Sequence, residues 1–109
     1  MDACHALAEP PRRAIVEMLA REGALSATEI GARFPVSAPA ISQHLKVLRE
    51  AGLVRVEKRA QQRIYRVNPE AMAEVEEFAR GVRQLWSQRF DALDALLQAE
   101  QAKSRKESE

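Results

Sequence analysis

Two helix starts that follow each other closely constrain the fold of this chain most. The stretch Ser26-Ala27-Thr28-Glu29 matches a capping box, in which the side chains of Ser26 and Glu29 each accept a hydrogen bond from the other's backbone N–H. The helix that follows is expected to end at Pro35, and Ser37 is a good N-cap for a longer helix that stops at Gly52. Two helices joined by so tight a turn cross at a steep angle, which predicts a helix-turn-helix.

After Gly52 the hydrophobic period changes from helical to alternating. With an alternating period, Leu53, Arg55 and Glu57 point to one side and Val54, Val56 and Lys58 to the other. The pattern resumes over residues 63–67 after the polar tip 59–62, until Asn68-Pro69 breaks it. Two short strands around such a tip predict a β-hairpin, although the tip has no Asn-Gly or Asp-Gly pair. A hairpin appended to a helix-turn-helix is a wing, so the expected fold is mainly α with a small β-hairpin.

Further helices are expected at both ends of the chain. Residues 2–8 suggest a short helix, and Pro10-Pro11 suits the first turn of a second helix that ends at Gly23. From Met72 to Leu97 apolar residues keep three- and four-residue spacing, which predicts a helix roughly 40 Å long. One winged-helix core cannot cover a helix of this length. We expect one domain over residues 1–100 and a charged, frayed tail over 101–109.

Composition and charge fit a soluble chain that offers one face to a polyanion. The 109 residues are 46% apolar and 30% charged, and the N-terminus resembles neither a signal peptide nor a membrane span. The net charge is only +1, but residues 33–68 hold eight basic and two acidic residues, a local balance of +6. This basic middle between acidic flanks favours nucleic-acid binding, with solvated surface charge as the alternative. The single Cys4 fits a reducing compartment, so the expected location is the cytoplasm.

Residues suited to catalysis or metal binding are scarce. The chain has only two histidines, His5 and His44, and neither a glycine-rich phosphate loop nor an HExxH motif. Cys4 beside His5 is a neighbour pair in sequence, which does not place a nucleophile opposite a base. We therefore expect neither an enzyme, nor a cofactor, nor a metal site.

The start of the helix after Ser37 meets the demands of major-groove binding. Small residues at Ala38, Pro39 and Ala40 permit close approach to base edges. Ser42 and Gln43 follow one turn later with short polar groups that can hydrogen-bond bases or phosphates. The alternative is that both are ordinary surface residues.

Other polar residues nearby are expected to reach the DNA backbone. His44 and Lys46 lie further along the same helix, and Arg59 and Arg63 flank the hairpin tip, where basic groups suit phosphates or a minor groove. For His44 a satisfied structural or merely exposed imidazole is an equal alternative.

The segments "LAEPPRRAIVEMLA" and "LSATEIGARFPVSAPAISQHLKVLREAGLVRVEKRAQQRIYRVNP" resemble the ArsR/SmtB family of bacterial winged helix-turn-helix repressors. The resemblance implies a homodimer, built through the first and last helices, that binds an inverted-repeat operator in double-stranded DNA and represses transcription. The residues implied to contact DNA are Ser37, Ala38, Pro39, Ser42, Gln43, His44, Lys46, Arg59, Gln62 and Arg63. The residues expected in the dimer interface are Leu7, Phe78, Val82, Leu85, Trp86, Phe90, Leu93 and Leu97.

The chain departs from the family's pattern in several places. The helix before the recognition helix lacks the Cys-x-Cys of the thiolate sensors, and the last helix lacks the histidine of the zinc sensors. Ala38 replaces a commoner glutamine, so readout there is expected to rely on shape or methyl contact. These departures place the chain closest to a branch without recognised metal sites.

Two alternatives stay open at this point. Within the same fold, the regulator responds to an unidentified effector, either at Cys4 through oxidants or metals, or at an organic-ligand site beside Trp86 and Phe90. In a different class, the winged helix serves as a platform for protein interaction.

Overall fold

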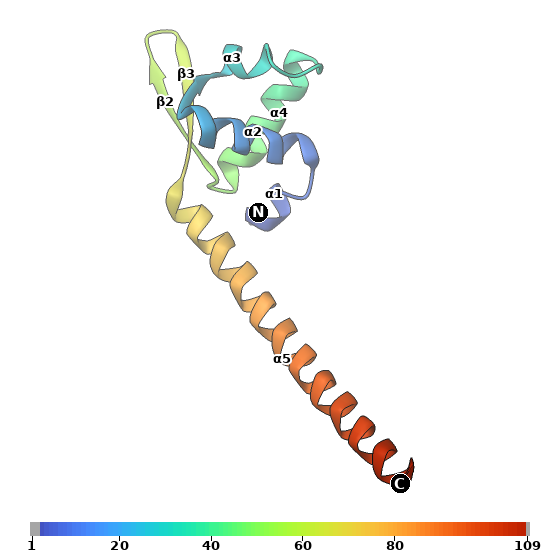
Figure 1. The fold of residues 1–109 in the computed structure, drawn as a ribbon. Coiled ribbons are helices and arrows are strands. Elements are labelled where there is room, and N and C mark those ends of the chain that lie inside the picture. The colour runs from blue at the N-terminus through green and yellow to red at the C-terminus, as the bar shows by residue number, and fades with distance from the viewer. Residues whose placement is uncertain (1–2, 109) are drawn as a thin grey trace. The chain divides into compact units, whose positions relative to one another are not determined.

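The computed structural model describes residues 3–108, which form five helices and three strands (Figure 1). The elements in chain order are α1 (Ala3–Ala6), α2 (Pro10–Glu22), β1 (Ala24–Ser26), α3 (Ala27–Gly31), α4 (Ala38–Glu50), β2 (Val54–Arg59), β3 (Gln62–Val67) and α5 (Pro69–Ser108). Asp2, which we expected in the first helix, lies outside the described residues. The chain forms two compact units, one up to Val75 and one from Glu76 onward. The mainly helical winged helix-turn-helix predicted from the sequence is confirmed.

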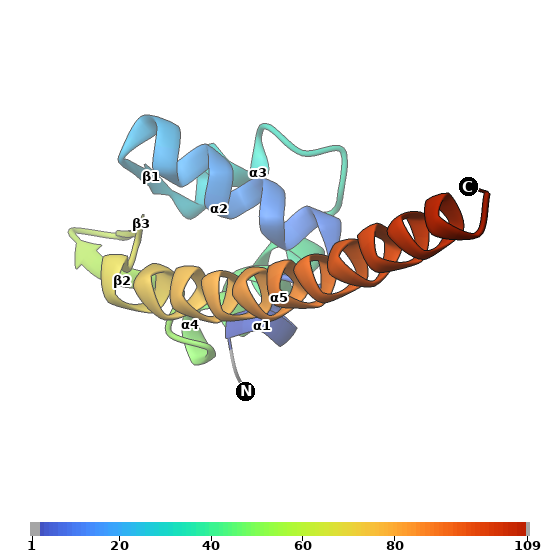
Figure 2. The same cartoon turned by 60° about the horizontal axis from the view of Figure 1, so that its bottom comes forward.

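The helix-turn-helix consists of α3 and α4, joined by residues 32–37, a loop visible in Figure 1 and from another side in Figure 2. The capping box forms as predicted, because the Ser26 hydroxyl accepts from the Glu29 N–H and the Glu29 carboxylate accepts from the Ser26 N–H, both at 3.1 Å. At the start of α4, the Ser37 hydroxyl accepts from the Ala40 N–H at 3.3 Å. The prediction that the first of these helices runs to Pro35 was wrong, since α3 ends at Gly31.

The wing belongs to a three-stranded antiparallel sheet in the order β1-β3-β2. Sequence reasoning missed β1, which pairs Leu25 with Tyr65 and Ser26 with Ile64. Because three residues are too few for an alternating pattern to show, β1 is recognisable only through its pairing with β3. Its pairing makes β3 the central strand and attaches the wing to the segment that starts α3.

The hairpin between β2 and β3 is tighter than predicted. Arg59 pairs directly with Gln62, so only Ala60 and Gln61 form the turn. Ala60 has a φ of 54°, a left-handed conformation that lets a two-residue turn follow the strand twist but disfavours a residue with a Cβ.

The core of the first unit fixes the orientation of α4. Ile41, Leu45 and Leu48 are at most 4% exposed and pack with α2 residues such as Ile15 and Leu19. Since these three residues of α4 share one helical face, their burial determines which side chains of α4 point to solvent.

Asn68 connects the end of α4, the end of the sheet and the start of α5. Its side-chain amide donates to the Gly52 carbonyl at 2.8 Å, and its backbone N–H donates to the Leu53 carbonyl at 2.9 Å. Its side-chain oxygen accepts from the Glu70 N–H at 3.2 Å. One residue therefore fixes the wing's base to the end of the recognition helix.

Arg12, which is only 7% exposed, holds α1 against α2. Its Nε donates to the Ala6 carbonyl at 2.6 Å, and its guanidinium pairs with Glu9 at 3.0 Å. Glu9 makes no side-chain cap to α2, so its contribution at this junction is the ion pair. Burial of the arginine is compatible with its charge because both kinds of partner are present.

Helix α5 is a single helix of 40 residues, about 60 Å long. The sequence predicted a frayed tail over residues 101–109; α5 includes residues 101–108 of it, and Glu109 lies outside the described residues. Arg105 and Lys106 in the last turn complement the helix dipole. From Phe78 onward its large apolar side chains are more than half exposed in the single chain. Within residues 3–108, no helix combines the length and apolar character needed to cross a bilayer.

Candidate nucleic-acid interface

The first turn of α4 presents small side chains to solvent. Ser37, Ala38 and Pro39 are exposed, and Ala40 is half-buried. The Ser37 hydroxyl is engaged with the Ala40 N–H, so it already serves as a helix cap. No bulky side chain at this end of the helix prevents another molecule from approaching the backbone.

Ser42 and Gln43 are exposed one turn further on, next to the buried Ile41. Neither has a protein partner among the described residues, so their polar groups are available to a ligand. Because Ile41 and Leu45 fix the rotation of the helix, both polar side chains are held on the solvent side.

His44 and Lys46, both expected to reach the DNA backbone, differ in their surroundings. Lys46 is exposed and has no ion pair among residues 3–108. His44 is half-buried, and its Nδ1 is buried without a hydrogen-bond partner in the described chain. Only the Nε2 side of this imidazole therefore remains as a candidate for a contact outside the protein.

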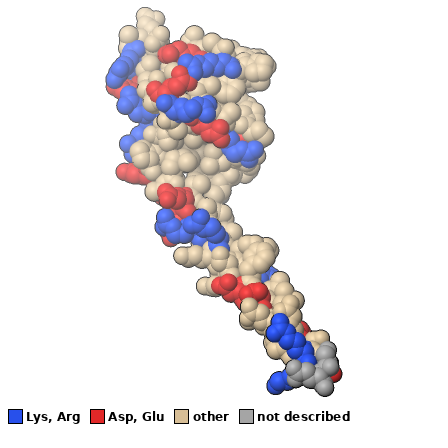
Figure 3. Space-filling model, in the orientation of Figure 1, with Lys and Arg blue, Asp and Glu red and all other residues tan. Residues whose placement is uncertain are grey.

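On the wing, Arg59, Gln62 and Arg63 are all exposed. Arg59 lies 3.6 Å from the Glu57 carboxylate, an exposed ion pair of small energy that leaves the arginine available. Arg63 pairs across the strands with Lys58, and like charges opposite each other destabilise a hairpin. On the face shown in Figure 3, basic side chains follow the edge of the molecule along which the β2–β3 hairpin runs. This arrangement favours a negatively charged partner.

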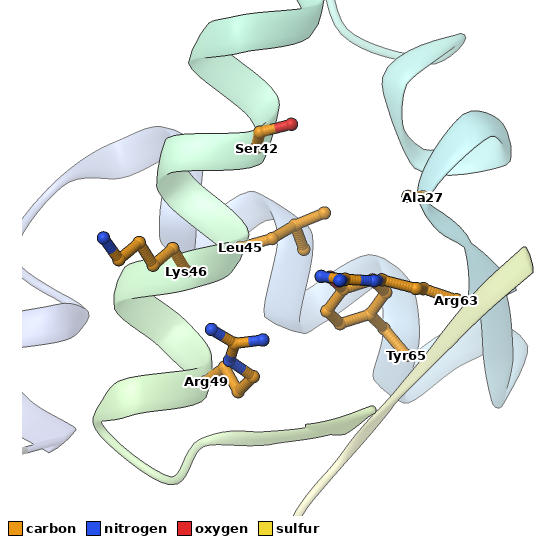
Figure 4. A pocket seen from close by; sticks show the side chains of 7 residues that line it. All are labelled: Ala27, Ser42, Leu45, Lys46, Arg49, Arg63 and Tyr65. Carbon is orange, nitrogen blue, oxygen red and sulfur yellow. The ribbon is translucent and has the colours of Figure 1, made fainter. Parts of the chain in front are cut away.

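A hollow of about 400 Å³ lies between α4 and β3 (Figure 4). Its lining residues are Ala27, Ser42, Leu45, Lys46, Arg49, Arg63 and Tyr65. Sequence reasoning did not single out Arg49 or Tyr65. The residue spacing could have indicated both. Arg49 shares a helical face with Ser42 and Lys46, and Tyr65 shares a strand face with Arg63, so each lies beside a predicted DNA contact.

The residues considered for an effector lie elsewhere. Cys4 is exposed, and no group of three or more His, Cys, Asp or Glu side chains converges within the part of the chain that the structure describes. Trp86 and Phe90 pack edge to face with ring centroids 5.2 Å apart, and they line an open apolar hollow with Arg89 and Leu93.

An exposed recognition helix, held by a capped partner helix and followed by a basic hairpin, defines the winged helix-turn-helix class of DNA-binding domains. A family model described as a helix-turn-helix domain matches residues 7–57.

Curated relatives and solved structures are similar to most of the chain. The HTH-type transcriptional regulator Rv2034 of Mycobacterium tuberculosis is 48% identical over 71 residues, which cover 65% of each protein. The arsenic resistance transcriptional regulator ArsR1 of Pseudomonas putida is 37% identical over 76 residues, covering 70% of this chain and 59% of that protein. The similarity thus spans less than two thirds of either regulator's length.

A crystal structure of a possible transcriptional regulator for arsenical resistance superposes with a TM-score of 0.70 at 39% identity, covering 75% of this chain and 84% of that one. The chain belongs to the ArsR/SmtB family of winged helix-turn-helix transcriptional regulators, a family of regulators rather than enzymes.

Proposed function

We propose that this chain is a homodimeric, cytoplasmic transcriptional repressor that binds an inverted-repeat operator. Each protomer places residues 37–51 in a major groove and residues 58–63 on the adjacent backbone or minor groove. Bound at a promoter, such a dimer occludes the DNA from polymerase.

The observation that carries this proposal is the exposed start of α4. A helix whose leading side chains are small can bring its backbone close to base edges, and polar groups on its groove-facing side can then bond those edges. Ala38 and Pro39 provide the first feature, and Ser42 and Gln43 provide the second. The burial of Ile41 and Leu45 holds these groups in one orientation, so little ordering is required on binding.

The proposed dimer rests on the exposed apolar side chains of α5. Exposed fractions range from 51% for Val82 and Leu93 to 69% for Leu85, and soluble monomers rarely leave such a contiguous stripe uncovered. The proposed interface residues on α5 are Phe78, Val82, Leu85, Trp86, Phe90, Leu93 and Leu97. Leu7, which is partly buried beside the core, is the proposed contribution from the N-terminal segment.

Dimerisation is tested by Leu85→Glu, which places a charge in the apolar stripe. In sedimentation experiments we expect the wild type to be a dimer and the variant to be a monomer. Gln84→Glu introduces the same charge at an exposed position off the stripe and should leave the dimer intact. A Leu85→Glu protein that still sediments as a dimer would exclude this interface.

DNA binding is tested by fluorescence anisotropy with a duplex carrying an inverted repeat from the promoter of the protein's own gene. We expect one dimer per repeat and tighter binding than to a scrambled duplex of equal composition. Affinity should fall steeply with salt, because bound phosphates release counterions. Equal affinity for both duplexes at every salt concentration would refute sequence-specific repression.

A further inference from the structure

The hollow between α4 and β3 concentrates positive charge without compensation. Lys46, Arg49 and Arg63 line it, and none of its lining residues is acidic. None of these three cations has an ion pair among the described residues, whereas Arg12, Arg33, Arg55, Arg59, Arg66 and Arg80 each have a carboxylate within 4 Å. Other cations, such as Arg21, are unpaired too, but here three unpaired cations line one space that has no carboxylate in its wall.

The side chains reach the hollow from two different elements. Figure 4 shows the guanidinium of Arg49 on α4 and that of Arg63 extending from β3 toward the same space, whereas the Lys46 amine points to the opposite side of α4. Two cations facing one hollow repel each other unless an anion lies between them. Guanidinium groups present several N–H donors in a plane, a geometry that matches phosphate oxygens.

Tyr65 adds a neutral donor to the wall. Its side chain is only 5% exposed, and its hydroxyl has no hydrogen-bond partner within residues 3–108. The Ser42 hydroxyl lies at the other end of the hollow (Figure 4). Two guanidiniums and two hydroxyl-bearing residues line one space, a set of donors that suits a singly charged oxyanion.

We propose that this hollow binds a phosphodiester oxygen of the operator backbone, with Arg49 and Arg63 as the charged contacts and Tyr65 as a hydrogen-bond donor. The inference rests on the proposed function. If α4 occupies a major groove and the wing reaches the adjacent minor groove, the strand that separates the two grooves must pass between α4 and β3. The hollow lies between these two elements, so the phosphates of that strand are the nearest anions.

The test compares Arg49→Gln with a matched control in anisotropy titrations of the operator duplex. Arg49→Gln should weaken binding roughly tenfold, the effect of losing one charge-assisted hydrogen bond. The slope of log affinity against log salt should decrease by about 1 per protomer. Arg21→Gln removes another exposed charge without an ion pair, from α2, and should change neither quantity. Tyr65→Phe should weaken binding less than Arg49→Gln, and thermal melts of all three variants verify that they fold.

Duplexes with a neutral methylphosphonate at single backbone positions locate the contact. At one position on the strand between the two grooves, we expect the methylphosphonate to weaken wild-type binding and to abolish the difference between wild type and Arg49→Gln. Titration with inorganic phosphate at constant ionic strength provides the second arm. If phosphate changes the operator affinity of the wild type but not of Arg49→Gln, and no methylphosphonate has an effect, the hollow binds a free anion and the backbone assignment is overturned.

The outcomes separate this inference from the proposed function. If the wild type prefers the inverted repeat but Arg49→Gln behaves like Arg21→Gln, the phosphate site is refuted and the repressor stands. If the wild type shows no preference for the repeat, the proposed function itself has failed.

Discussion

Replacing Asn68 by alanine removes two side-chain hydrogen bonds at the junction of α4, β3 and α5. One is the bond from the amide to the Gly52 carbonyl, at 2.8 Å in a partly buried setting, and its loss should cost about 1 kcal/mol. The other is the cap on the Glu70 N–H at the start of α5, whose loss should also cost about 1 kcal/mol. We therefore expect Asn68→Ala to lower the free energy of unfolding by about 2 kcal/mol.

The assay is urea denaturation followed by circular dichroism, with wild type and variant at equal protomer concentration because dimerisation contributes to stability. Asn68→Ser separates the two bonds, since a serine hydroxyl retains the cap but does not reach Gly52. It should lose about 1 kcal/mol. A change below about 0.5 kcal/mol for Asn68→Ala, in the range of ordinary surface substitutions, would refute the role of Asn68 as a structural junction.

Three further substitutions test other parts of the fold by the same denaturation assay. Ala60→Gly should stabilise the protein by about 1 kcal/mol, because glycine adopts the left-handed conformation of the hairpin tip without steric cost; an unchanged midpoint would contradict the observed φ of 54°. Leu48→Ala should destabilise the protein by about 2–5 kcal/mol, since Leu48 is fully buried between α4 and the rest of the core. Arg12→Met should cost about 2 kcal/mol by releasing the Ala6 carbonyl, and proteolysis near α1 should accelerate; equal protease resistance would show that α1 is held by other contacts.

The parts of the fold that local rules determine were predictable from the sequence. The capping box at Ser26, the cap at Ser37 and the glycine at 52 are short-range signals, and each forms in the structure. The switch from helical to alternating period after Gly52 predicted the β-hairpin of the wing, because a half-buried strand exposes every second side chain.

Features that depend on contacts distant in sequence were not predictable. The strand β1 exists through its pairing with β3, some forty residues later, and Asn68 meets Gly52 only because the hairpin returns to its base. The early end of α3 at Gly31 shows the same limit, since boundaries follow packing as well as caps.

The candidate site was only partly visible in the sequence. The exposed start of α4 followed from periodicity, because buried Ile41 and Leu45 imply exposed Ser42 and Gln43. The convergence of Arg49 with Arg63 required the position of β3 relative to α4, which no sequence pattern encodes. The sequence left a structural or merely exposed imidazole as an equal alternative for His44, and its half-buried position depends on the same packing.

The central claim is that the start of α4 reads bases whereas the wing contacts the backbone. The most direct test measures affinities for a panel of operator duplexes in which each base pair of the half-site is changed in turn, for wild type, Gln43→Ala and Arg63→Ala. Gln43→Ala should lose discrimination at one position of each half-site, by about 1–3 kcal/mol. Arg63→Ala should weaken binding by the same factor for every duplex. If Gln43→Ala instead weakens all duplexes equally and preserves the discrimination of the wild type, the assignment of α4 as the base-reading element is contradicted.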